Sequence, residues 1–127
     1  MERLRQRADF LAAASGIKVP ATAFVLQARN RRDTGPARLG FTVSKKVGNA
    51  VERNRVRRRL REIVKRASEE VAHAGHDYVL VGRRAGLSAP FGGLLDDFTS
   101  ALRRLHEGRG KARGTELRRP SGGRKNP

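Results

Sequence analysis

A run of one-signed charge on an amphipathic segment constrains this chain more than any other feature. Between Arg53 and Arg66 the sequence places eight basic side chains within fourteen residues, and Glu62 is the one acid among them. Like charges at this density repel one another and destabilise the compact state. A fold that keeps them is therefore expected to present them to a partner of opposite charge.

The same segment has the pattern of a core-facing helix. Its apolar residues recur at spacings of three and four and fall in one stripe: Val56, Leu60, Ile63, Val64, Ala67 and Val71. Asn49 is a suitable N-cap, and Glu52 three residues later completes a capping box. We expect a helix from Ala50 to about Ala74 that stops at Gly75. Its basic residues divide into an outer face with Arg58, Arg61 and Lys65, one flank with Arg55, Arg59 and Arg66, and Arg57 on the other flank.

Two strands are predicted before this helix. In ATAFVLQARN, residues 21–30, Phe24 and Leu26 share one face, and Val25 and Gln27 share the other. RLGFTVSK, residues 38–45, alternates in the same way. The turn-forming composition of RRDTGP between them favours an antiparallel hairpin.

Further elements complete the prediction. A short helix is expected over Arg5–Ala14, with Phe10 and Leu11 facing inward and Gly16 ending it. DYVLVG, residues 77–82, is strand-prone, and apolar spacing predicts a last helix from Phe91 to Leu105. The order of elements predicts one small α+β domain over residues 1–107. Residues 108–127 hold one aliphatic side chain, Leu117, and are predicted to be a basic, disordered tail.

Overall charge narrows the class of partner. The chain has 29 basic and 12 acidic residues, which favours a nucleic acid over an anionic membrane. It has no cysteine, so disulfides and thiolate metal sites are excluded. No apolar run reaches the ~20 residues of a membrane span, and no signal-peptide pattern follows the N-terminus. We therefore expect a soluble cytoplasmic protein.

No catalytic centre made of protein groups is predicted. His73 and His76 are three residues apart, but no cysteine or suitably spaced carboxylate joins them, so solvated histidines are favoured over a metal site. Asp96 and Asp97 are helix neighbours that point about 100° apart and do not converge. The sequence also lacks a phosphate-cradling glycine loop and a plausible nucleophile. By itself the polypeptide does not have the pattern of an enzyme, and no organic cofactor is expected.

The motif SKKVGNAVERNRVRRRLRE, residues 44–62, resembles the signature of the bacterial ribonuclease P protein subunit. The likeness extends to Ala8-Asp9-Phe10, to Phe24-Val25-Leu26, to DYVLVGR and to the last helix, over residues 5–106. Within the motif the matching residues are Ser44, Lys45, Lys46, Gly48, Asn49, Ala50, Val51, Arg53, Asn54, Arg55, Arg57, Arg58 and Arg61.

This resemblance implies a fold and a function. The fold is a small sheet packed with three helices, with a left-handed βαβ crossover that departs from the usual right-handed rule. The function is that of a protein cofactor for a catalytic RNA, which with its Mg²⁺ ions removes the 5′ leader of precursor tRNA. The implied partners are the RNA subunit and precursor tRNA, with no DNA and no membrane.

The resemblance also implies two surfaces. Phe10, Val25 and Gln27, with the adjoining side of the basic helix, would form a cleft for the single-stranded leader. The RNA subunit would be bound by Lys45, Lys46, Asn49, Arg53, Asn54, Arg55, Arg57, Arg58, Arg61 and Lys65. The chain departs from the family pattern in having Ala13 and Ala14 where a second aromatic is common, Gln27 where an aromatic is common, and Arg57 in place of a lysine.

Other classes of protein share part of this pattern. A ribosomal or other structural RNA-binding protein, or a DNA-compacting protein, has similar size, charge and basic ends. Neither class accounts for the motif from Lys45 to Arg61. A membrane-surface role would need bulky apolar residues at the polar boundary of the basic helix, and these are absent.

Overall fold

A mixed β-sheet with helices on both faces makes up the described part of the chain. The computed structural model describes residues 2–67, 72–107 and 111–112. Along the chain the elements are β1 (Glu2–Arg3), α1 (Arg7–Ala14), β2 (Ile17–Pro20), β3 (Phe24–Asn30), β4 (Arg38–Thr42), the 3₁₀ turn η1 (Lys45–Val47), α2 (Ala50–Arg66), β5 (His76–Gly82), the 3₁₀ turn η3 (Arg84–Leu87), α3 (Phe91–His106) and β6 (Lys111–Ala112).

The sheet has the strand order β1-β4-β5-β3-β2-β6, so β5 lies between β3 and β4. β5 pairs antiparallel with β3, with Leu80 opposite Leu26, and parallel with β4, with Leu80 opposite Phe41. The predicted hairpin between β3 and β4 is therefore wrong. The residues of β5 from Asp77 to Leu80 are all buried. A strand buried in this way needs a paired strand on each edge and packed side chains on each face, and a position at the centre of the sheet provides both.

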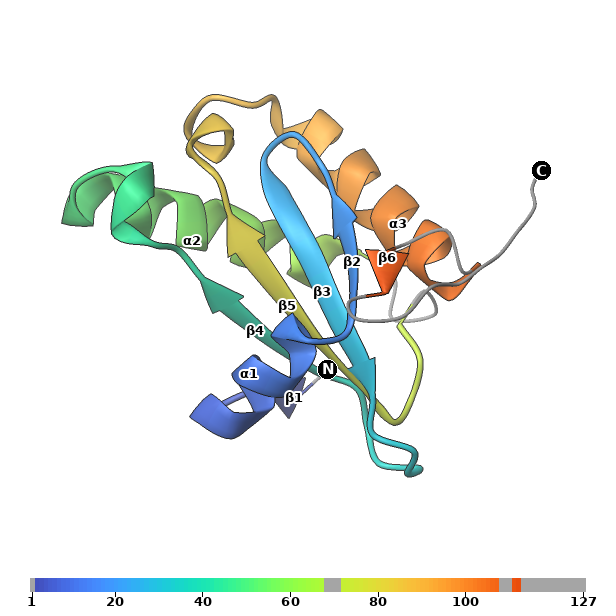
Figure 1. The fold of residues 1–127 in the computed structure, drawn as a ribbon. Helices are drawn as coiled ribbons and strands as arrows, with labels where there is room; N and C mark the ends of the chain where they lie inside the picture. The colour runs from blue at the N-terminus through green and yellow to red at the C-terminus, as the bar shows by residue number, and fades with distance from the viewer. Residues whose placement is uncertain (1, 68–71, 108–110, 113–127) are drawn as a thin grey trace.

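The connection from β4 to β5 is a left-handed crossover, as the resemblance implied. In Figure 1 both strands point upward, β5 lies to the right of β4, and α2 passes behind the sheet between them. The basic helix is thereby placed across one face of the sheet, with its first turn beside the carboxyl end of β4. The α+β class and the three helices are confirmed.

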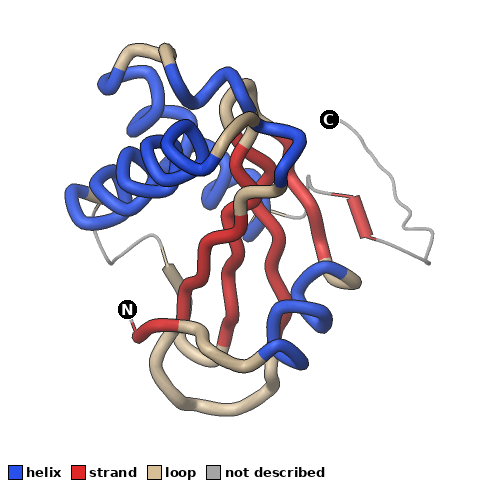
Figure 2. The backbone as a smooth tube through the Cα atoms, turned by 90° about the vertical axis from the view of Figure 1, so that its left-hand side faces the viewer, coloured by secondary structure: helices blue, strands red, loops and turns tan. Residues whose placement is uncertain are grey.

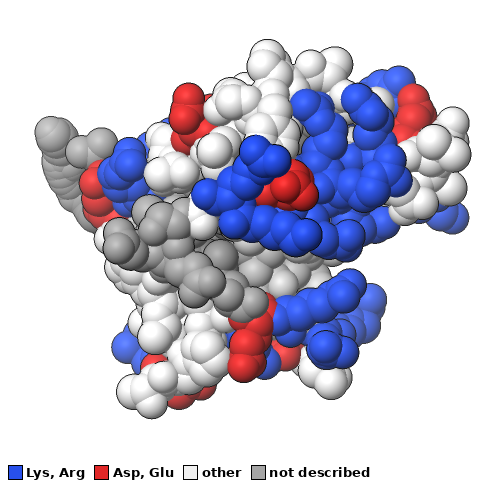
Figure 3. Space-filling model, turned by 180° about the vertical axis from the view of Figure 1, so that it is seen from behind, with Lys and Arg blue, Asp and Glu red and all other residues white. Residues whose placement is uncertain are grey.

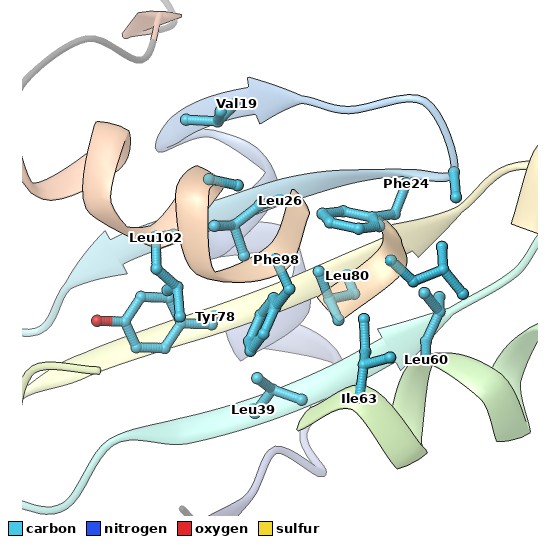
Figure 4. Packing of buried hydrophobic residues seen from close by; sticks show 14 of the residues in the cluster. Val19, Phe24, Leu26, Leu39, Leu60, Ile63, Tyr78, Leu80, Phe98 and Leu102 are labelled. Atoms are coloured by element: carbon cyan, nitrogen blue, oxygen red, sulfur yellow. The ribbon is translucent and has the colours of Figure 1, made fainter. Parts of the chain in front are cut away.

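The main core lies between the sheet and the pair α2 and α3. Val56, Leu60 and Ile63 of α2 are fully buried there, as their spacing predicted. Phe24 of β3 meets Phe98 of α3 edge to face, with ring centroids 6.4 Å apart. Figure 4 shows Leu60, Ile63, Phe24 and Phe98 gathered around Leu80 of the central strand. Because Val56, Leu60 and Ile63 face the core, the opposite face of α2 is left on the outside of the protein.

α2 ends at Arg66, earlier than predicted, because Ala67 already has extended backbone angles. A helix of 17 residues is about 26 Å long, close to the roughly 23 Å of the seven-residue strand β5 that follows. A helix that continued to Ala74 would overshoot the strand. Residues 68–71 lie outside the described part of the chain.

α1 covers the opposite face of the sheet from α2 and α3 (Figure 2). Leu4 and Ala13 are buried there against Val79, with Phe10 partly buried beside them. Leu11 is 55% exposed, so the prediction that it faces inward is wrong. The strand β2, which was not predicted, starts after Gly16, where a side chain would collide with the carbonyl oxygen of Ala28.

Two residues of the predicted tail belong to the sheet. Lys111–Ala112 form β6 and pair antiparallel with Ile17 and Lys18 of β2, so the expectation of disorder does not hold for them. The rest of that tail, residues 108–110 and 113–127, lies outside the described part. Among the described helices, none is long and apolar enough to cross a membrane.

Candidate nucleic-acid interface

One flank of α2 is bound to the protein itself. Arg59 donates to the carbonyl oxygens of Gly86 at 2.6 Å and Ala89 at 2.5 Å, after the end of β5. The Nε of Arg55 donates more weakly to Leu87 O at 3.4 Å. Arg66 lies over the ring of Phe91, 5.1 Å from its centroid. These arginines hold α2 against η3 and α3, so this part of the positive charge has a structural use.

The remaining basic face of α2 is directed outward. Asn54, Arg58 and Lys65 are exposed, while Arg53, Arg57 and Arg61 are partly exposed. Arg57 donates to Asn54 Oδ1 at 2.9 Å, and none of these cations forms an ion pair within the described residues. The Nε of Arg53 is buried without a hydrogen-bond partner there. Figure 3 shows lysine and arginine gathered over this helix, with few carboxylates between them.

The first turn of α2 is built by its capping residues. Asn49 Oδ1 accepts from the Glu52 N–H at 2.9 Å, and a Glu52 carboxylate oxygen accepts from the Asn49 N–H at 3.0 Å. Arg84 bonds to Glu52 and, with the Asn49 N–H, holds the pKa of the Glu52 carboxyl below its usual value. Lys45 and Lys46 are exposed on η1 beside this turn. The Oδ1 of Asn49 is therefore occupied by the cap.

A groove of about 510 Å³ lies on the other face of the sheet, beside α1, and we call it the α1 groove. Two residues that the sequence proposed, Phe10 and Gln27, line it. Val25 lies on the same face of β3, opposite Val81, but is not among the lining residues. Ala14, noted above as a position where a second aromatic is common in the family, also lines it. The sequence did not assign the other lining residues to this groove, and these are Arg5, Arg7, Leu11, Phe41, Thr42, Val79 and Val81.

Phe10 is placed in this groove by a glycine and an ion-pair network. A Cβ on Gly40 would lie 2.5 Å from the tip of the Phe10 ring, so only glycine lets the ring rest on β4 at this point. The neighbouring Asp9 pairs with Arg29 at 2.8 Å and with Arg38 at 3.5 Å. These ion pairs of Asp9 hold α1 against β3 and β4. The position of α1 in turn determines where the Phe10 ring lies.

The three histidines form a cluster in which His73 is exposed and His76 and His106 are partly buried. His73 stacks on His106 with centroids 3.5 Å apart, and His76 meets His106 edge to face at 5.0 Å. The Tyr78 hydroxyl lies 2.6 Å from His106 Nε2. Burial, together with the nearness of His73 and His76, lowers the pKa of His106 to about 4. Within the described residues, no group of three or more His, Cys, Asp or Glu side chains could hold a metal ion.

A sequence model of the ribonuclease P family matches residues 1–106. The chain belongs to the ribonuclease P protein family. It is 52% identical over 107 residues to the ribonuclease P protein component of Ruegeria pomeroyi, covering 81% of this chain and 85% of that one. The corresponding protein of Gluconacetobacter diazotrophicus is 52% identical over 103 residues, covering 80% and 89%.

Solved structures of ribonuclease P proteins have the same fold. The protein from Thermotoga maritima superposes with a TM-score of 0.68 at 31% identity, covering 82% of this chain and 97% of that one. The protein from Staphylococcus aureus gives 0.66 at 28% identity, covering 83% and 95%. The ribonuclease P resemblance of the motif at residues 44–62 is therefore confirmed for the whole domain.

Family membership gives the coarse function directly. Members are protein components of ribonuclease P, a tRNA-processing ribonuclease that contains RNA. A match across residues 1–106 also removes the main reason for considering a ribosomal or DNA-compacting protein, since those classes shared only size and charge with this chain. Which residues bind which RNA is a separate question.

Proposed function

We propose that this protein binds the RNA subunit of ribonuclease P through the outward face of α2, and the single-stranded 5′ leader of precursor tRNA through the α1 groove. The RNA subunit carries out Mg²⁺-dependent removal of the leader, and the protein acts as a non-catalytic subunit in the cytoplasm. The observation that carries this proposal is the separation of the α1 groove, with its apolar floor, from the cationic outward face of α2.

The α1 groove fits a single strand. Its floor has Val79, Val81 and the Phe10 ring, and its rim has the cations Arg5 and Arg7. Single strands are bound by stacking surfaces combined with a positively charged groove, without base-specific contacts. Since Phe10 and Phe41 are the aromatic residues of the lining, stacking is limited and the arginines contribute a larger share of the affinity.

The face of α2 fits a folded RNA. Arg53, Arg57, Arg58, Arg61 and Lys65, with Asn54 and with Lys45 and Lys46 on η1, offer donors over a helix about 26 Å long. Arginine forks match phosphate oxygens in two-point contacts. Arg55 and Asn49 of the expected set are partly committed to the protein, through Leu87 O and the helix cap. We assign them a supporting role at this surface.

The donors on the proposed RNA-binding surface are arginine, lysine and asparagine side chains. Mg²⁺ prefers carboxylate and phosphate oxygens with several waters. These residues do not fit a protein-held magnesium ion, so we assign Mg²⁺ to phosphate oxygens of the RNA subunit. The protein residues would neutralise neighbouring phosphates and orient the leader.

The variant F10L tests the leader site, because leucine keeps apolar packing against Leu4 and Val79 and removes the aromatic plane. We expect the affinity of the reconstituted holoenzyme for precursor tRNA to fall about five-fold or more, with affinity for leaderless tRNA unchanged. Equal losses on both substrates would reassign Phe10 to the core and contradict the leader site.

A further inference from the structure

A second groove lies on the α2 side of β4, and we call it the α2–β4 groove. Its volume is about 390 Å³, at the low end of the ~300–1,000 Å³ typical of small-molecule sites. It is lined by Glu2, Arg3, Leu39, Phe41, Arg61, Val64, Lys65 and Ala67. Only Phe41 is shared with the α1 groove. The space suits one nucleotide and not an extended strand.

The groove has a flat cationic plane that is already held in place. The guanidinium of Arg61 lies over the Phe41 ring, 5.7 Å from its centroid and within cation–π range. Arg61 donates no hydrogen bond to any described residue, so the aromatic ring is the contact that orients it. Guanidinium planes are surfaces on which unpaired bases of RNA stack. Helical projection alone placed Arg61 on the outer face of α2, whereas the structure leans it over β4.

The net positive charge of the side chains that line the α2–β4 groove favours an anionic ligand. Arg3, Arg61 and Lys65 stand against the single acid Glu2, and the apolar floor is formed by Leu39, Phe41 and Val64. A base needs the apolar floor and the stacking plane, and the phosphate attached to it needs the cations. The basic tail of this chain carries the wrong charge to fill such a site.

The geometry points to a binding site for one unpaired RNA nucleotide in the α2–β4 groove, with its base stacked on Arg61 and its phosphate near Arg3 and Lys65. Phe41 acts as a positioning residue that holds the Arg61 guanidinium over β4. The inference rests on the proposed function, since it takes RNA as the partner. The nucleotide comes either from the leader or from a loop of the RNA subunit.

NMR titration of the full-length protein with hexa-adenylate tests the site without the RNA subunit. Val64 lines only the α2–β4 groove, and Val79 and Val81 line only the α1 groove. Ala67 lines the α2–β4 groove and also a hollow between α2 and α3, so Val64 is the decisive reporter and Ala67 the supporting one. We expect the amides of both pairs to shift on titration. In R61K the shifts at Val64 and Ala67 should be lost or need about ten-fold more RNA, while those at Val79 and Val81 persist. If Val64 and Ala67 do not move in the unaltered protein while Val79 and Val81 do, the site is overturned and the leader groove stands.

The opposite flank of α2 supplies matched controls. Arg66 lies over Phe91 as Arg61 lies over Phe41, but on the side that packs against α3. R66K and F91L should leave the shifts at Val64 unchanged, while F41L weakens them. Because R61K keeps the charge, its loss of affinity should come with no change in salt dependence. An equal loss in R66K would show that the effect is not specific to Arg61 and would overturn the stacking site.

The reconstituted holoenzyme identifies the source of the nucleotide. If the leader supplies it, R61K weakens binding of precursors with long leaders and spares a precursor whose leader has been shortened to one nucleotide. If the RNA subunit supplies it, R61K weakens assembly equally whatever the substrate. Wild-type behaviour of R61K in both assays would contradict the site. Failure of the unaltered protein to support cleavage would instead contradict the proposed function.

Discussion

Arg38 and Asp77 form a two-point ion pair in the sheet, with Nε 2.8 Å from Oδ1 and Nη2 2.8 Å from Oδ2. Asp77 is fully buried and also accepts from Arg29 at 3.0 Å and from Arg31 at 2.6 Å. Burial alone would raise the pKa of Asp77, but the hydrogen bonds from these arginines outweigh it and hold the pKa below its usual value. One acid on β5 thus organises three cations from β3, β4 and the loop between them.

Replacing Asp77 by asparagine should destabilise the protein strongly. Three arginines would lose the carboxylate that satisfies them, and removal of one partner from a buried ion pair costs about 3–5 kcal/mol of unfolding free energy. Urea denaturation at pH 7 measures this. D33N removes an exposed acid that pairs with Arg31 and should have a much smaller effect. Comparable losses in the two variants would contradict a central role for Asp77.

Adding a methyl group at Gly40 should impair leader binding through Phe10. The new Cβ would lie 2.5 and 2.6 Å from two ring carbons of Phe10, so the ring must swing away while the backbone stays in place. We expect G40A to lower affinity for precursor tRNA about as much as F10A does, with little change in melting temperature. In an F10A background, G40A should have no further effect on leader affinity. Additive losses would mean that Gly40 acts by another route.

Two neighbouring arginines of α2 should behave differently. Arg58 is exposed and directed outward, so R58Q should weaken assembly with the RNA subunit and flatten its salt dependence by about 0.7–0.9 in log–log slope. Arg59 donates to two backbone carbonyls, so R59Q should lower the unfolding free energy by about 2 kcal/mol and leave that slope unchanged. Binding titrations at several salt concentrations, with melting curves, separate the two effects. An unchanged slope in R58Q would contradict the outward face as a phosphate surface.

Mild acidification should destabilise the protein through His106. Because burial lowers the pKa of His106 from 6.5 to about 4, the unfolded chain binds a proton between these values that the folded protein does not. The unfolding free energy should therefore fall as pH drops from 6.5 to 4. The lowered pKa values of Asp33, Glu52 and Asp77 place the loss of their contributions at lower pH still.

The variant H106Q isolates this effect, since glutamine can still accept from the Tyr78 hydroxyl. Denaturation at a series of pH values should give a shallower slope between pH 4 and 6.5 for H106Q than for the unaltered protein. Identical slopes would show that His106 is not the group responsible.

Local patterns predicted much of the fold. The buried stripe of α2, the apolar spacing of α3 and the alternating faces of β3 depend on side chains within one element, so their periodicity is visible in the sequence. The pairing of strands could not be predicted from such local patterns. β3 lies between β2 and β5, and β5 is about 50 residues further along the chain. Nothing in the turn at residues 31–36 reveals that pairing. The handedness of the crossover came from the resemblance alone.

For the candidate sites too, local spacing predicted which residues are exposed but not which distant residues they contact. Spacing placed Arg58 and Lys65 on the outer face of α2 correctly. It could not show that Arg55 and Arg59 meet carbonyl groups near η3, or that Arg61 meets Phe41, because those partners come from distant segments. Val79 and Val81 were missed for a related reason. They lie in a continuous apolar run, YVLV, whose alternate residues face the α1 groove and the main core.

Cleavage of precursor tRNA at low Mg²⁺, with and without a bacterial ribonuclease P RNA, tests the central claim most directly. The account predicts that the protein alone leaves the substrate intact and that it restores accurate removal of the leader when the RNA is present at physiological salt. Cleavage by the protein alone would contradict a non-catalytic role. Tight RNA binding without any restored cleavage would contradict the proposed action of the protein on the leader.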